Sequence, residues 1–181
     1  MVGNLSVTGS TYLTSSGVNV LNVYGSGSSQ PIFNVEGSVG ALIRASDTTS
    51  GSLFSVNNFT GLPILEVFSD NTTYIGNFPS RAMYTSFEVY TQSGSNVIYG
   101  METGSFDAMF VDYVIRSGSV SRAGNITALW SGSQTTKTET TTVDFGNSTS
   151  AAFNVNIVGT QAQLGITTGG IWRVKTIIKS I

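Results

Sequence analysis

The sequence predicts an all-β protein in two parts: a shaft of short repeated strands over residues 1–80 and a jelly-roll-like β-sandwich head over residues 81–181. Three observations support this prediction. Short apolar clusters recur at nearly equal spacing in the first part, and longer segments of alternating polarity fill the second part. Only 10% of the 181 residues are charged, and Ser, Thr, Asn and Gly take their place. These residues favour turns and disfavour helix interiors.

The shaft repeat is a four-residue cluster with the pattern apolar, apolar, polar, apolar. Its clearest copies lie at residues 20–23, 32–35, 42–45, 53–56 and 64–67. The second positions are separated by 12, 10, 11 and 11 residues, and such fixed spacing is typical of a repeat architecture. Pro31 and Pro63 each precede a cluster, where the first residue of a strand tolerates proline.

Each of these strands is partly apolar on both faces, whereas a strand wetted on one face alternates cleanly. One chain offers a thin line of such strands, so we expect three copies wound about a common axis, each covering the others. A single-chain β-helix and a meander packed on the second half are the alternatives. The predicted trimer core consists of Leu21, Val23, Phe33, Val35, Ile43, Phe54, Val56, Leu65 and Val67.

The head shows longer candidate strands without a helical period. We expect them at residues 87–90, 96–100, 109–116, 125–130, 143–145, 152–158, 163–166 and 172–178. About eight strands at this spacing indicate a sandwich or jelly roll. The polar run from Thr135 to Thr142 is expected to be an exposed loop.

Several function classes receive no support from the composition. The formal charge is −2 without a basic cluster, which disfavours nucleic-acid binding. The chain has neither cysteine nor histidine, so thiolate metal sites and the commonest general base are missing. The N-terminus lacks signal-peptide features, and no apolar run approaches the ~20 residues of a membrane span. We expect a protein made in a cytoplasm that is not an enzyme and has no cofactor, metal or membrane insertion.

Two groups of charged residues are weighed as sites. A glycoside hydrolase places two carboxyl groups across the scissile bond, and Glu36, Asp47, Glu66 and Asp70 are the candidates in the shaft. We expect them instead to be solvated charges at strand edges. Around one predicted hairpin the charged residues Asp107, Asp112, Arg116 and Arg122 lie close in sequence, and surface or interface ion pairs are expected there rather than a metal or receptor site.

Aromatic and hydroxyl side chains in the head supply candidates for receptor contact, because exposed Tyr and Trp anchor interfaces and stack on sugars. The candidate receptor-contact residues are Tyr90, Tyr99, Trp130, Thr136 and Thr138. For the aromatic members, packing in the core or between subunits is the competing interpretation.

The stretch from residues 110–113 through 122–124 to 172–178 resembles the small β-sandwich head domains of bacteriophage fibre proteins, and the clusters at 51–56 and 62–67 are similar to their shaft repeats. Gly/Ser/Thr-rich β repeats also occur in bacterial adhesins. The resemblance implies a homotrimeric structural protein of the virion, as a tail fibre, head fibre or capsid decoration. Its N-terminal end would join other virion proteins, and its head would serve attachment to a host-surface glycan or protein. A tailspike-like carbohydrate depolymerase and an adhesin or lectin module are the alternatives.

Overall fold

The computed structural model describes residue 23 and residues 31–78 and 80–181. The described residues form thirteen β-strands and no helix, so none of them belongs to a helix long and apolar enough to cross a membrane. The predicted all-β class is confirmed.

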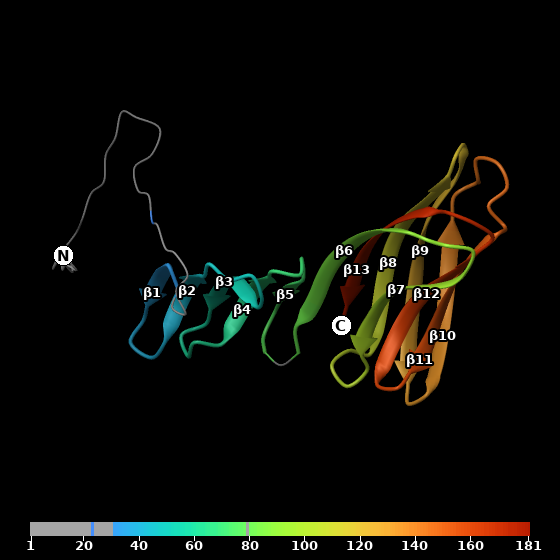
Figure 1. The fold of residues 1–181 in the computed structure, drawn as a ribbon. Helices are drawn as coiled ribbons and strands as arrows, with labels where there is room; N and C mark the ends of the chain where they lie inside the picture. The colour runs from blue at the N-terminus through green and yellow to red at the C-terminus, as the bar shows by residue number, and fades with distance from the viewer. Residues whose placement is uncertain (1–22, 24–30, 79) are drawn as a thin grey trace.

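The first part of the described chain is a meander of five short strands (Figure 1). Its strands are β1 (Phe33–Glu36), β2 (Ala41–Ala45), β3 (Ser52–Asn57), β4 (Pro63–Phe68) and β5 (Thr73–Ile75). Each pairs antiparallel with the next strand in the chain. The apolar clusters at 32–35, 42–45, 53–56 and 64–67 therefore coincide with β1 to β4 to within one residue at each end. Since paired strands lie about 4.8 Å apart, β1 and β5 are about 20 Å apart.

The meander continues the sheet of the head instead of packing on it. Strand β5 pairs with β6, and the resulting ten-stranded sheet has the order β1-β2-β3-β4-β5-β6-β13-β8-β9-β10. In Figure 1 the strands from β5 to β1 extend away from the head as a row. The alternative of a meander covered by the second half is therefore not the arrangement of this chain.

Two antiparallel sheets form the head. Its strands are β6 (Ala82–Tyr90), β7 (Gly94–Glu102), β8 (Ala108–Ser117), β9 (Val120–Ser131), β10 (Gln134–Thr141), β11 (Ala151–Val158), β12 (Gln161–Thr168) and β13 (Arg173–Ser180). A second sheet of order β11-β12-β7 faces the strands β6, β13, β8, β9 and β10. One hydrophobic core draws on both sheets, and its most deeply buried side chains include Met83, Met109, Ile115, Ile126, Leu164, Ile166 and Ile178.

Two sequence expectations for the head are wrong. The polar run Thr135–Thr142, expected as an exposed loop, lies almost wholly in β10, which pairs with β9 along its whole length. Threonine is β-branched and fits a strand, and Gly132, with φ of 58°, allows the tight turn from β9. Residues 143–145 form no strand; they contribute one isolated bridge, between Phe145 and Ser121.

The core assignment predicts unequal costs for two leucine truncations. Leu164 on β12 is fully buried, so Leu164→Ala should lower the free energy of unfolding by about 2–5 kcal/mol through the cavity it leaves. Leu129 on β9 is half exposed, and Leu129→Ala should cost less than about 1 kcal/mol. Denaturant unfolding followed by the fluorescence of Trp130 and Trp172 measures both; equal losses would contradict the assigned core.

Candidate interaction surfaces

One face of the meander is almost entirely apolar. Directly paired residues project from the same face of a sheet, and the pairs Phe33–Ala45, Ala45–Phe54 and Phe54–Val67 form one row across it. The pairs Val35–Ile43, Ile43–Val56, Val56–Leu65 and Leu65–Ile75 form a second row beside the first. We call this surface the apolar face; it consists of Phe33, Val35, Ile43, Ala45, Phe54, Val56, Leu65, Val67, Thr73 and Ile75.

No described part of the chain covers the apolar face. All of its side chains are half-buried or exposed, and within residues 31–78 the fully buried residues are Ala41, Ser55 and Thr72. The contrast with the head is sharp, because there a second sheet buries the inner face. A contiguous apolar surface of this kind marks an interaction site in a soluble protein.

Seven of the nine predicted trimer-core residues lie on the apolar face, namely Phe33, Val35, Ile43, Phe54, Val56, Leu65 and Val67. Of the other two, Leu21 lies outside the described residues, and Val23 is exposed and belongs to no strand. Their contact with sister chains stays a prediction.

The opposite face of the meander, the mixed face, carries the polar third position of each cluster. Asn34, Arg44, Ser55, Glu66 and Tyr74 are paired across it in series. The apolar first positions, such as Leu42 and Leu53, accompany them. This face is therefore less uniform than the apolar face.

An arginine and aromatic cluster joins the mixed face to the head. Arg81 Nη1 donates to Glu66 Oε2 at 2.8 Å, and its guanidinium lies 4.2 Å from the centre of the Tyr74 ring. Tyr74 in turn stacks on Phe106 of the head, with ring centres 6.3 Å apart. Burial raises the pKa of the Tyr74 hydroxyl, although the nearby Arg81 acts against this shift. The cluster fixes the last turn of the meander against the head.

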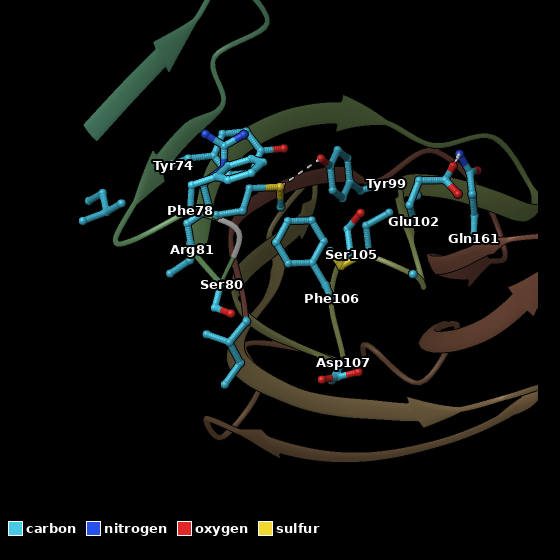
Figure 2. Close-up of a pocket in the computed structure, with 17 residues that line it drawn as sticks. Tyr74, Phe78, Ser80, Arg81, Tyr99, Glu102, Ser105, Phe106, Asp107 and Gln161 are labelled. Carbon is cyan, nitrogen blue, oxygen red and sulfur yellow. Dashed lines mark hydrogen bonds between the residues drawn. The ribbon is translucent and has the colours of Figure 1, made fainter. Parts of the chain in front are cut away.

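Beside this cluster lies a cavity of about 880 Å³. Figure 2 shows Tyr74, Phe78 and Arg81 at one end, Tyr99 and Phe106 in the middle, and the Glu102–Gln161 pair at the other end. Gln161 Nε2 donates to Glu102 at 3.0 Å, while the Tyr99 hydroxyl has the weak acceptor Met83 Sδ at 3.4 Å. The cavity thus combines aromatic rings with carboxylate and amide groups, and its volume lies in the range of small-ligand sites.

The structure does not bring the candidate receptor-contact residues together. Trp130 is only 5% exposed and its Nε1 donates to the Phe106 carbonyl at 2.7 Å, so this side chain belongs to the core and is withdrawn as a contact residue. Tyr99 lines the cavity. Tyr90, on β6, and Thr136 and Thr138, on β10, are exposed on the outer face of the large sheet but lie on its first and last head strands.

The shaft carboxylates are also separated within the chain. Glu36 is on β1 and Glu66 is on β4, three strand spacings or about 14 Å away, beyond the ~5–9.5 Å between the carboxyl groups of glycosidases. Glu66 is engaged by Arg81, and Asp70 Oδ1 accepts from the Thr72 amide at 2.9 Å in a turn. These carboxylates hold local structure.

The four charged residues expected near one hairpin likewise separate. Asp112 lies on the outer face of the head, 3.2 Å from Lys179. Arg122 points inward, 3.5 Å from Glu139, and donates to Ser148 and to the Ala151 carbonyl. The expected surface ion pair is therefore found for Asp112, whereas Arg122 forms its ion pair on the inner side of the sheet, and the spacing suggested neither partner.

Comparison with models of known protein families, with curated proteins and with solved structures found no match.

A buried tyrosine predicts how stability depends on alkaline pH. Burial and a 2.5 Å hydrogen bond to Glu139 raise the pKa of Tyr113 well above its usual value of 10.0, with Arg122 acting against them. The neutral phenol is thus favoured in the folded head. The contribution of Tyr113 to the free energy of unfolding is complete below about pH 10 and is lost as the pH rises further.

Tyr113→Phe should therefore weaken this alkaline loss. We expect the urea midpoint of the wild type to fall more between about pH 9 and about pH 11 than the midpoint of the variant. Tyr74 and Tyr99, whose pKa values are also raised by burial, should leave the variant with a smaller dependence of the same sign. Identical changes in the two proteins would show that Tyr113 ionises no later in the folded head than in the unfolded chain.

Proposed function

We propose that this protein is a structural protein of a bacteriophage virion, a homotrimeric fibre or capsid-decoration protein. Its meander is the shaft, and its two-sheet domain is a jelly-roll-like head displayed for attachment. The single observation that supports the proposal most is the apolar face, two rows of half-buried or exposed side chains on a sheet with no second layer among the described residues. Three copies about one axis supply the missing layer to one another.

The energetics favour such an assembly. Fully burying a Val, Leu, Ile or Phe side chain contributes about 1.5–3 kcal/mol, and those on the apolar face remain partly accessible in one chain. Burial of the remaining area accumulates along the meander, because every strand from β1 to β5 adds side chains to the same face. A fibre built this way gains contact area with each repeat.

The direction of the meander supports the proposed attachment to the particle. Strand β1 is the described strand farthest from the head along the sheet, and the C-terminal strand β13 belongs to the head, between β6 and β8 (Figure 1). In this proposal the N-terminal end joins other virion proteins and the head points outward. The resemblance of the repeats and head to phage fibre proteins is the reason for choosing a virion over another trimeric assembly.

Native mass tests the proposal directly. We expect light scattering to give three times the chain mass of 19.0 kDa. Phe54→Asp should abolish assembly, because three carboxylates would enter an apolar interface without partners. Val143→Asp is the matched control, since Val143 is 95% exposed and lies outside the apolar face. A monomeric wild type, or a Phe54→Asp variant with trimer mass and unchanged melting, would refute the proposed shaft.

A second candidate function, sugar binding, is favoured by the cavity beside Tyr74. Sugars stack on aromatic rings and exchange hydrogen bonds with carboxylates and amides, and the cavity offers Phe78, Tyr99, Glu102 and Gln161. This would make the cavity, rather than the loops of the head, the site of host-glycan attachment or of a lectin-like activity.

A glycan array tests the sugar site. If the wild type binds a glycan, Phe78→Ala and Glu102→Gln should each weaken binding about tenfold or more, since each removes a stacking or hydrogen-bonding group. Tyr90→Ala is the matched control because Tyr90 is an exposed aromatic residue outside the cavity. Absence of binding, or equal loss in all three variants, would argue against the cavity as the sugar site.

A further inference from the structure

The turns of the meander form two rows along its opposite edges. Successive turns of an antiparallel meander alternate between edges, so residues 37–40, 58–62 and 76–78 lie on one edge and residues 46–51 and 69–72 on the other. Two contacts confirm this. A Cβ added to Gly40 would lie 3.2 Å from the Gly61 Cα, and the Ser69 amide donates to the Gly51 carbonyl at 3.0 Å.

The two rows differ in chemistry. We call residues 37–40 and 58–62 of the first row the apolar turn row, because they display Val39, Phe59 and Leu62, all exposed. Phe78, in the next turn on this edge, lies against Arg81 at the cavity and is not part of this row. The second, the polar turn row, displays Asp47, Thr49, Ser50, Asp70 and Asn71. Large apolar side chains thus gather on one of two edges that are otherwise equivalent in backbone topology.

The turn at residues 58–62 is built to display Phe59. The Asn58 side chain accepts from the Thr60 amide at 2.9 Å and from the Leu62 amide at 3.0 Å, and Gly61 takes a φ of 83°. The turn therefore satisfies these amides internally and does not draw its aromatic residue inward. Phe59 remains 75% exposed at the tip.

Charge follows the same division. All five charged side chains of residues 31–78 lie away from the apolar face and the apolar turn row. Arg44 and Glu66 are on the mixed face, Glu36 accepts from Asn34 on that face at 2.8 Å, and Asp47 and Asp70 are in the polar turn row. Arg81, in the turn from β5 to β6, is engaged by Glu66 on the mixed face. The apolar face and the apolar turn row therefore form one uncharged corner from β1 to β4.

We propose that this corner points toward the axis of the trimer, so that the apolar turn row of each chain packs against the apolar turn rows of the other two, while the polar turn row faces solvent. The inference rests on the proposed trimer and specifies which edge of the meander is central. The occupant of the corner is a second copy of this chain.

The regular spacing of the row identifies that occupant. Successive turns on one edge are two strands apart, or about 10 Å, and a partner must present apolar groups at the same interval over the same length. When three copies are related by rotation about an axis along the meander, their three Phe59 residues lie at the same level along that axis. The sister chains therefore match the spacing without further adjustment, and the corner holds no charge that would need a counter-ion.

Single cysteine variants test the orientation cleanly, because the chain contains no cysteine of its own. Phe59→Cys and Val39→Cys place a thiol in the apolar turn row at two heights, and Thr49→Cys places one in the polar turn row. Each purified full-length variant is first weighed by light scattering and then treated with a short bis-maleimide. Since each chain has one thiol, crosslinking gives a band at twice the chain mass on a denaturing gel.

We expect strong crosslinking in trimers of Phe59→Cys and Val39→Cys, and at least tenfold less in trimers of Thr49→Cys. If Phe59→Cys alone fails to assemble, crosslinking of Val39→Cys still supports the orientation. Trimers that crosslink through Thr49→Cys, or through none of the three, would overturn the orientation and leave the proposed trimer standing. A wild type that weighs as a monomer would overturn both.

Discussion

The part of the molecule formed by β1 to β5 is governed by one constraint: a single layer of short strands cannot keep water from its own apolar side chains. Strands of three to six residues with no sheet stacked on them leave both faces accessible. The head meets the same constraint internally, because β7, β11 and β12 cover β6, β8, β9 and β13 and bury Leu164 and Ile178 completely. In the meander no such layer comes from the described chain, and its stability depends on what covers Phe54 and its neighbours.

The pairing of β5 with β6 determines how the packing of the meander affects the head. Because β5 pairs directly with β6, the faces of the meander continue as the faces of the large sheet of the head. Tyr74 is paired with the core residue Met83, whereas Ile75 is paired with Ala82. The salt bridge from Arg81 to Glu66 and the stack of Tyr74 on Phe106 then hold the last turn in place. In the proposed trimer, packing of the meander against sister chains would therefore also set the orientation of the head.

Periodicity predicted the positions of the short strands β1 to β4 but not that they pair in sequence as a meander continuing the sheet of the head. Alternation is a local property, and the apolar second and fourth positions of each cluster share one face once the strands pair. Periodicity could not predict contacts between residues that are far apart in the sequence. Trp130 is held in the core by its hydrogen bond to the Phe106 carbonyl. Arg122 is held on the inner side of the sheet by Glu139 and Ser148. Strand β10 was missed because a threonine-rich run is polar like a loop, yet its β-branched side chains suit an edge strand. The cavity joins β5, β7, the 104–107 segment and Gln161, which no single motif unites.

The direction of the strands in the meander has a mechanical consequence. Hydrogen bonds in an antiparallel ladder run perpendicular to the strands, and the row of strands extends away from the head (Figure 1). A pull between the head and β1 therefore acts along those bonds. The strand pairs then separate one after another, and no pair shares the load with another. In an isolated chain the pull is opposed by the hydrogen bonds of only one strand pair at a time. In the proposed trimer, resistance to tension would come from the side chains that pack between neighbouring chains.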